Sequence, residues 1–224
     1  MSDLPVRPWL SVFVLATALV FSGGCSKVTH IVKPSDPFFT EAYKPVCEAW
    51  SQDARIYRGF EVELIATATY KSEEYRRAYT DEYAEAYKLT APQKEDFWQD
   101  QLEALTRGHE FVMASFVSIE QWDDFHRADS MWKIYFINDQ DDRVVPVEIR
   151  QFKRQGKVRR RDSVKSHFLP YDTPWKSVYT IKFPYDVPGT NRPLISDETK
   201  NFKLIITSVL GTAQMEWELK EIDD

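Results

Sequence analysis

The sequence predicts a mainly β protein, namely a seven-stranded antiparallel β-sandwich that carries an inserted helical hairpin. Apolar and polar residues alternate with a period of two in most segments after residue 108, which is typical of half-buried strands. Turn-forming residues at 138–142 and 210–212 separate some of these segments and favour antiparallel neighbours. Between residues 72 and 108 the apolar period lengthens to about four, which indicates helices. The alternative is an α+β arrangement.

The first predicted strand spans residues 60–70, where every second residue from Phe60 to Tyr70 is apolar. Residues 111–118 are apolar on both faces, so we expect a strand that is covered on both sides. Five further strands are expected at 132–137, 145–150, 179–183, 202–206 and 215–219. Pro146 cannot donate a hydrogen bond to a neighbouring strand, so it should mark an edge or a bulge.

Capping residues delimit two helices in the hairpin at 72–108. Ser72 can cap the first helix, in which Glu73 and Glu74 favour the positive end of the helix dipole. Residues 90–93, with the sequence Thr-Ala-Pro-Gln, match a capping box with proline in the first turn of the second helix. Gly108 is placed to end that helix. We therefore expect the hairpin to be inserted between two strands.

Tyrosines recur every four residues along the first of these helices, at Tyr75, Tyr79, Tyr83 and Tyr87. Each step of four residues drifts by about 40°, so the four rings cover a stripe of about 120°, the width of a buried face. Tyrosine has a flat apolar face with a polar edge, so the stripe could form an aromatic platform that stacks on sugars. Packing of the hairpin against the sheet or the second helix is the favoured interpretation.

The two cysteines of the chain, Cys25 and Cys47, lie in different sequence surroundings. Residues 42–54 have the pattern of a helix, and Cys47 lies there beside Val46 and Trp50. We expect Cys47 to be a buried, inert thiol, because a catalytic cysteine needs a histidine partner and an electropositive pocket. If Cys25 is consumed in a thioether, no disulfide can form within the chain.

The amino-terminal segment combines a short head, which contains Arg7, with an apolar run at residues 9–21. Thirteen helical residues extend about 20 Å, which is shorter than the hydrocarbon core of about 30 Å, so a signal peptide fits better than a permanent span. The run ends at Ser22-Gly23-Gly24-Cys25, which resembles the lipobox of bacterial lipoproteins, although Ser22 stands where that pattern most often has leucine. The alternatives are a secreted protein cut near Gly24 and an uncleaved anchor.

The resemblance implies that a signal peptide at 1–24 is removed and that Cys25 receives a diacylglycerol thioether and often an N-acyl chain. Ser26 behind the cysteine implies sorting to the outer membrane of a Gram-negative cell. Two or three acyl chains would hold the protein stably on the membrane. We then expect residues 25–37 to be a polar tether and residues 38–224 to be the β-sandwich domain, with a helix near its start and the hairpin at about 72–108.

Trp132 opens the third predicted strand, where an immunoglobulin-like sandwich often has its core tryptophan. The sequence resembles that fold at this one position. The cysteine pair that characterises immunoglobulin domains is absent, so the resemblance concerns the architecture alone.

A basic segment interrupts an otherwise acidic protein, whose formal charge is −6. That charge argues against nucleic acid as a partner. Lys157, Arg159, Arg160 and Arg161 could contact lipid phosphate, lipopolysaccharide or an acidic protein, because arginine binds phosphates and carboxylates in a bidentate manner. The favoured interpretation is a solvated loop between two strands.

The sequence contains no compact catalytic motif, and we expect no cofactor, no metal and no catalytic residue. His109-Glu110 lacks a second histidine one turn later, where Met113 stands. Residues 138–142 lack the glycine and the closing glutamate of a calcium loop. Asp123 and Asp124, near Glu120, match only a loose pattern for paired carboxylates. The aromatic and proline-rich segment 168–175 could line a groove, although covering the end of the sandwich is favoured.

These observations predict a lipid-anchored envelope lipoprotein that acts as a non-enzymatic interaction or assembly module. Its expected partners are the membrane, through the lipid anchor, and an envelope protein. The alternative is a hydrolase or transferase that acts on cell-wall or surface glycans, or a glycan-binding module. No compact catalytic motif supports the enzyme, and a fold alone does not fix a function.

Overall fold

The computed structural model describes residues 39–152, 168–173 and 175–219. The predicted signal peptide, the predicted lipidation site Cys25, the predicted tether at 25–37, and the basic residues Lys157, Arg159, Arg160 and Arg161 lie outside the described residues. Among the described residues, no helix is both long and apolar enough to cross a membrane.

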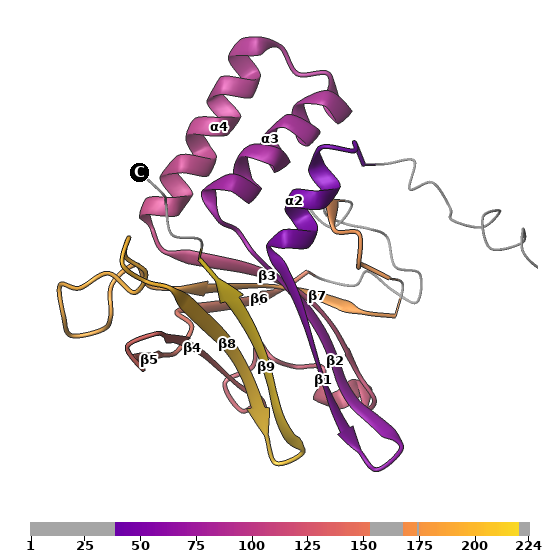
Figure 1. Ribbon diagram of the computed structural model, residues 1–224. Helices are drawn as coiled ribbons and strands as arrows, with labels where there is room; N and C mark the ends of the chain where they lie inside the picture. The colour runs from indigo at the N-terminus through magenta and orange to yellow at the C-terminus, as the bar shows by residue number, and fades with distance from the viewer. Residues whose placement is uncertain (1–38, 153–167, 174, 220–224) are drawn as a thin grey trace, which may run out of the picture. The chain divides into compact units, whose positions relative to one another are not determined.

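The described residues form a mainly β structure with two antiparallel sheets (Figure 1). The first sheet has the order β1 (Ser51–Arg58), β2 (Glu61–Tyr70), β3 (His109–Val117), β7 (Ser177–Phe183) and β6 (Glu148–Gln151). The second has the order β5 (Arg143–Val144), β4 (Lys133–Asn138), β8 (Asn201–Ser208) and β9 (Gly211–Glu218). The prediction of a mainly β protein with antiparallel strands is confirmed.

A shared core of large apolar side chains joins the two sheets in a sandwich-like arrangement. Leu64 and Phe111 of the first sheet and Phe202 of the second are fully buried in it. Across the sheets, the ring of Phe111 contacts the rings of Trp217 and Phe202 with centroid distances of 5.3 and 6.2 Å. Because aromatic side chains bury large areas, such contacts contribute strongly to the association of the sheets.

The structure corrects the predicted strand count, since the described residues contain nine strands where seven were expected. Residues 42–54 are not one helix, because α2 (Tyr43–Ala49) ends before Ser51 and β1 begins there. Antiparallel pairing with β2 along the whole of β1 overrides the local helical pattern. The predicted strand at 145–150 is confirmed only for residues 148–150, which belong to β6 in the first sheet, because residues 145–147 lie between β5 and β6.

The helical hairpin consists of α3 (Glu73–Tyr87) and α4 (Ala91–Thr106), which follow β2 and precede β3. The Oγ atom of Ser72 accepts a hydrogen bond from the backbone N–H of Tyr75 at 3.1 Å, as expected for the cap of α3. The Oε1 atom of Gln93 accepts one from the backbone N–H of Thr90 at 2.9 Å. Both predicted helix starts are therefore confirmed.

The helices gather at one end of the two sheets (Figure 1). We call this the helix end; β1 begins, β2 ends and β3 begins there. The opposite end, which we call the hairpin end, contains the β1–β2 and β8–β9 turns. A 3₁₀ turn (Glu120–Trp122) follows β3. At the helix end, the indole N–H of Trp217 donates a hydrogen bond to the carbonyl oxygen of Trp50 at 2.9 Å, which joins β9 to the start of β1.

Candidate functional site

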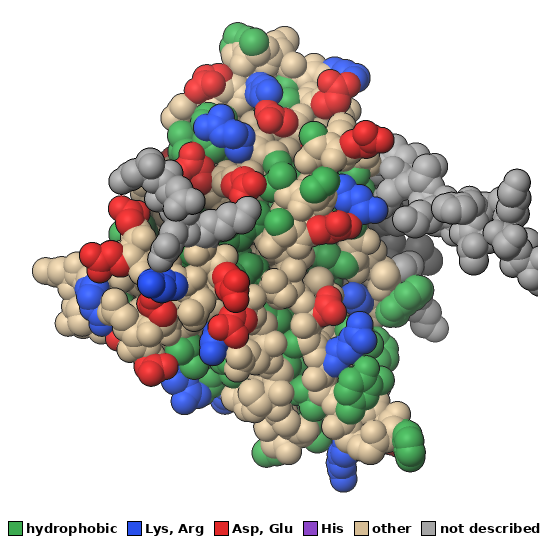
Figure 2. All heavy atoms as spheres, in the orientation of Figure 1, with side chains coloured by type: hydrophobic (Ala, Val, Ile, Leu, Met, Phe, Trp, Pro, Cys, Tyr) green, Lys and Arg blue, Asp and Glu red, His purple; other side chains and the backbone are tan. Residues whose placement is uncertain are grey.

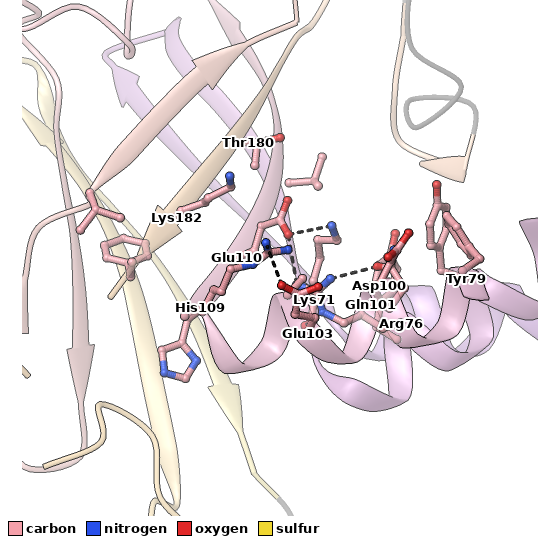
Figure 3. Close-up of a pocket in the computed structure, with 18 of the residues that line it drawn as sticks. Lys71, Arg76, Tyr79, Asp100, Gln101, Glu103, His109, Glu110, Thr180 and Lys182 are labelled. Atoms are coloured by element: carbon pink, nitrogen blue, oxygen red, sulfur yellow. Dashed lines mark hydrogen bonds and ion pairs between the residues drawn. The ribbon is translucent and has the colours of Figure 1, made fainter. Parts of the chain in front are cut away.

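A groove of about 660 Å³ lies at the helix end, between α4 and the face of the first sheet that points away from the second sheet. Figure 3 shows its charged residues, which come from α3, α4, β3, β7 and the segment after β2. Apolar side chains form much of the walls: Tyr75, Tyr79, Phe97, Val112, Val147 and Leu169. We call it the α4 groove.

The floor of the α4 groove is an ion cluster around the carboxylate of Glu110. Its Oε2 atom lies 2.9 Å from Nζ of Lys71 and 3.1 Å from Nη2 of Arg76. The guanidinium of Arg76, only 1% exposed, also donates from Nη1 to Oε1 of Gln101 at 3.0 Å and from Nε to the carbonyl oxygen of Lys71 at 2.9 Å. This cluster therefore joins the end of β2 and the start of α3 to α4 and β3.

Local structure explains how these charges meet. The backbone N–H of Lys71 donates to the carbonyl oxygen of Glu110 at 2.9 Å, which continues the β2–β3 pairing by one residue. Ser72 then caps α3 and turns the chain, so that Arg76 lies one helical turn further on, within contact of Glu110. The groove floor is therefore built by the junction between sheet and hairpin.

Electrostatics keeps Glu110 ionised. Burial alone would raise the pKa of its carboxyl group, but attraction to Lys71 and Arg76 and their hydrogen bonds lower the pKa to about 2. A general acid or base works best when its pKa lies near the operating pH. Glu110 is therefore suited to holding the two cations in place, and the cluster does not have the properties of an acid–base catalyst.

Exposed charges surround the opening of the α4 groove. On α4, Nη1 of Arg107 lies 3.4 Å from Oε1 of Glu103, and Asp100 is exposed nearby. On β7, Nζ of Lys182 lies 2.8 Å from Oε2 of Glu148. The groove thus combines apolar walls with a few fixed polar groups, which is typical of a binding site.

His109 precedes Glu110 in β3, and the two side chains point to opposite faces of the sheet. The His109 ring lies in the core, where Nδ1 is 3.0 Å from the Tyr70 hydroxyl and the ring stacks on Tyr185. Burial lowers the pKa of His109 to about 4. His109 and Glu110 therefore do not form a common ligand set for a metal.

The tyrosine stripe is largely a packing surface. Tyr75 and Tyr79 are buried, Tyr83 is half-buried, and Tyr87 is 47% exposed. Tyr79 contacts Phe97 of α4 and Phe168, with centroid distances of 5.8 and 5.2 Å. An aromatic platform needs several exposed rings, so Tyr75 and Tyr79 cannot supply an open stacking face, although both line the wall of the α4 groove.

Cys47 belongs to the same aromatic cluster as Tyr43 and Tyr75. Its side chain is fully buried, and burial raises the pKa of the thiol to about 11. The thiol is therefore protonated at neutral pH, in agreement with the inert thiol expected from the sequence.

The acidic residues considered as catalytic carboxylates form separate structural contacts. The carboxylate of Asp123 accepts hydrogen bonds from Tyr179 at 2.9 Å and from Ser177. Asp124 accepts one from Ser130 at 2.7 Å. These contacts hold the segment after β3 against β7 and against its own turn, and they leave the two carboxylates without a common function.

The possible calcium loop at 138–142 is a turn fixed by its own polar groups. The Oδ1 atom of Asn138 accepts hydrogen bonds from the backbone N–H groups of Gln140 and Asp142 at 3.1 and 2.9 Å. The carboxylate of Asp142 pairs with the guanidinium of Arg192 at 2.6 and 2.8 Å. Within the described residues, no group of three or more His, Cys, Asp or Glu could hold a metal ion.

The described part of the aromatic segment 168–175 partly covers the outer face of the first sheet. Phe168 and Leu169 are buried, and the Tyr171 hydroxyl contacts Thr69 and, at 3.3 Å, the carbonyl oxygen of Val112. Trp175 is exposed. The sequence favoured a segment that covers the end of the sandwich, whereas these contacts lie on the outer face of the first sheet.

Sequence reasoning missed Lys71 and Arg76 as partners of Glu110, and Gln101 as a partner of Arg76. The sequence did contain part of the information about the positions of these residues. Lys71 directly follows a predicted strand, and Arg76 lies on the tyrosine face of α3, one position after Tyr75. The pairing itself could not be read from the pattern.

Comparisons with known proteins add no assignment: no family model, no curated protein and no solved structure matches the chain.

Proposed function

We propose that this chain is a lipid-anchored protein of the bacterial outer membrane and that its folded part binds an envelope protein in the α4 groove without catalysing a reaction. Cys25 would carry the acyl chains, in line with the resemblance of residues 22–25 to a lipobox. Two or three chains would make the attachment stable.

The observation that carries the binding role is the preformed floor of the α4 groove. Lys71, Arg76, Gln101 and Glu110 already satisfy one another, so a ligand would meet a rigid surface and little ordering free energy would be lost on binding. The apolar walls supply area to bury, and the exposed charges of α4 supply specificity.

The glycan hydrolase or transferase is less well supported. Glycosidic cleavage needs two carboxylates about 5 to 10 Å apart, one of them with a raised pKa. Asp123 and Asp124 are engaged in different hydrogen bonds, and the pKa of Glu110 is lowered.

We also propose that the two sheets are a variant of the immunoglobulin-like sandwich. The support is the buried Trp132 directly before β4, whose indole N–H donates to the carbonyl oxygen of Trp122 at 2.8 Å. This architecture hosts many functions and adds nothing to the assignment of the groove.

The test places a photo-crosslinking amino acid at Glu103, on the rim of the α4 groove, in the full chain in its native envelope. The matched control is Glu95, which is an exposed glutamate on the same helix away from the groove. We expect one recurrent protein adduct from position 103 and none from position 95.

A second pair of variants tests whether the groove itself is the binding surface. Ala104→Trp would fill the groove, whereas Ala86→Trp adds the same ring on the exposed side of α3. The adduct should be lost only with Ala104→Trp, provided that circular dichroism shows both variants to be folded. Equal adducts in both variants would refute the groove as the binding surface.

A further inference from the structure

Exposed apolar side chains gather at the hairpin end. Phe60 and Val209 are almost completely exposed, and Tyr57 and Ile119 are exposed as well. Figure 2 shows hydrophobic and basic side chains at the lower end of this face, where the β1–β2 and β8–β9 turns lie in Figure 1. Exposed apolar patches of this kind mark interaction surfaces.

Strand pairing brings these residues to one end. Arg58 and Glu61 are the last register partners of β1 and β2, and Ser208 and Gly211 are those of β8 and β9. The two turns lie near each other, because a Cβ at Gly211 would lie 2.8 Å from Cγ2 of Ile56 in β1. Ile119 follows Ser118, whose backbone N–H donates to the carbonyl oxygen of Glu63 at 3.3 Å.

The shape and composition of this end suit a lipid bilayer. Phe60 and Val209 project from tight turns, so they form protrusions that a flat, soft surface can receive. Tyr57 and Arg58 adjoin the β1–β2 turn, and tyrosine and arginine are typical of the level of lipid headgroups. Glu61 and Glu120 lie at the same end, so contact would depend on apolar insertion more than on anionic lipid.

The chain between Cys25 and the folded part is long enough for the hairpin end to contact the bilayer that would hold Cys25. Residues 26–38 can extend at most about 45 Å. The folded part begins at the helix end, where α2 adds about 10 Å to the roughly 30 Å length of β2. The hairpin end is thus within reach of the bilayer that would hold Cys25.

We propose that the hairpin end docks on this same bilayer, with Phe60 and Val209 inserted below the headgroups and Arg58 beside the lipid phosphates. The inference rests on the proposed lipid anchor, which would keep the hairpin end at high effective concentration near the membrane. Docking at both points presents the helix end, and with it the α4 groove, away from the bilayer.

The experiment uses the lipidated full chain in vesicles of phosphatidylethanolamine, with and without phosphatidylglycerol, that carry nitroxide on the acyl chains. A thiol-reactive fluorophore is attached through Phe60→Cys or Val209→Cys, because Cys47 is buried and Cys25 would be acylated. The control is Tyr87→Cys, an exposed aromatic position at the helix end.

We expect loss of most of the emission at positions 60 and 209, little loss at position 87, and no strong dependence on phosphatidylglycerol. In a chain labelled at position 209, Phe60→Ser should restore several-fold more emission than Tyr87→Ser does.

Three other results would contradict either the docking of the hairpin end or the lipid anchor. Unquenched fluorophores at 60 and 209 on protein that floats with the vesicles would refute docking. A photo-crosslinker at position 60 that captures a protein in native envelopes, together with absent quenching, would assign the hairpin end to that protein instead. Failure of the labelled protein to float with the vesicles would refute the lipid anchor, which is a separate claim.

Discussion

Arg76 shows how a single residue can tie an inserted hairpin to a sheet. Its buried guanidinium donates to the carbonyl oxygen of Lys71, to Gln101 of α4 and to Glu110 of β3. A buried charge is costly unless it is paired and hydrogen-bonded, so every one of these acceptors matters for stability. Glu110 is the acceptor that also balances the charge.

Replacing the carboxylate is the direct test of this role. Glu110→Gln keeps the shape but removes the negative charge that Glu110 places beside Lys71 and Arg76, and we expect the free energy of unfolding to fall by about 3 kcal/mol. Glu148→Gln is the control, because Glu148 pairs with Lys182 and Arg150 at the surface and should cost less than about 1 kcal/mol. Urea denaturation measures both, and similar losses would contradict the buried-pair account.

The lowered pKa of Glu110 also predicts acid sensitivity. The folded carboxyl group has a pKa of about 2 and an ordinary value of 4.5, so its contribution is complete above pH 4.5 and is lost as the pH falls toward 2. The loss should amount to at most about 3 kcal/mol at 1.36 kcal/mol per pKa unit. Unfolding free energies measured between pH 5 and about 2 should fall more steeply for the wild type than for Glu110→Gln.

His109 should act in a different and higher pH window. Its folded pKa is about 4, whereas the ordinary value is 6.5, so the unfolded chain binds a proton between these values that the folded chain does not. Stability is therefore complete above pH 6.5 and falls as the pH decreases toward 4. His109→Gln should flatten the unfolding free energy in this range, and an unchanged slope would mean that the ring is protonated in the fold.

The residue-scale chemistry could be predicted from the sequence only in part. Cys47 was expected to be buried because its neighbours are apolar, and that local information was sufficient. The Glu110 cluster depends on residues 34 and 39 positions apart in the chain, and no local pattern encodes such pairing. The tyrosine spacing predicted a common face but could not tell how much of that face α2 and α4 would cover.

At the scale of elements, the junction between α4 and β3 is the least tolerant. Gly108 has φ of +141°, and a Cβ there would overlap the carbonyl oxygen of Phe183. Because Gly108 lies so close to the backbone of Phe183, the chain passes from α4 directly into β3. The first residue of β3, His109, pairs with Phe183 of β7. Gly108 thus positions the end of α4 against the first sheet.

Two glycine substitutions separate backbone strain from steric overlap. Gly108→Ala should lower the free energy of unfolding by about 3 kcal/mol, because it adds both an unfavourable φ and an overlap. Gly59→Ala has the same chemistry at φ of +63°, but nothing lies within 4 Å, so the expected loss is about 1 kcal/mol. Thermal unfolding of both variants checks the difference; equal losses would show that overlap at Gly108 is relieved by a backbone shift.

Elements with local signals were the ones that the sequence could predict. The hairpin helices carry their own caps at Ser72 and Thr90, and both helices are present. β1 was missed because its partner β2 supplies its hydrogen bonds while its own residues resemble a continuing helix. Pro146 was recognised as a problem for a strand, yet its consequence, a change of sheet between β5 and β6, is a tertiary property.

At the scale of the whole molecule, the proposed lipid anchor at Cys25 can be tested directly by membrane fractionation. Cys25→Ala should move the protein out of the membrane fraction or leave it unprocessed, because the acceptor sulfur is gone. Cys47→Ala is the matched control, since it removes the buried cysteine and should leave fractionation unchanged. Membrane fractionation and mass analysis of the mature amino terminus measure whether the protein is processed and acylated. Normal processing of Cys25→Ala would exclude a lipoprotein.

The contact between β1 and β9 has a consequence for the order in which the protein can fold. Trp217 of β9 bonds to Trp50, and Gly211 packs on Ile56, so the first strand of the sandwich is completed by the last. During synthesis, the contacts that β9 makes with β1 are missing until β9 has emerged.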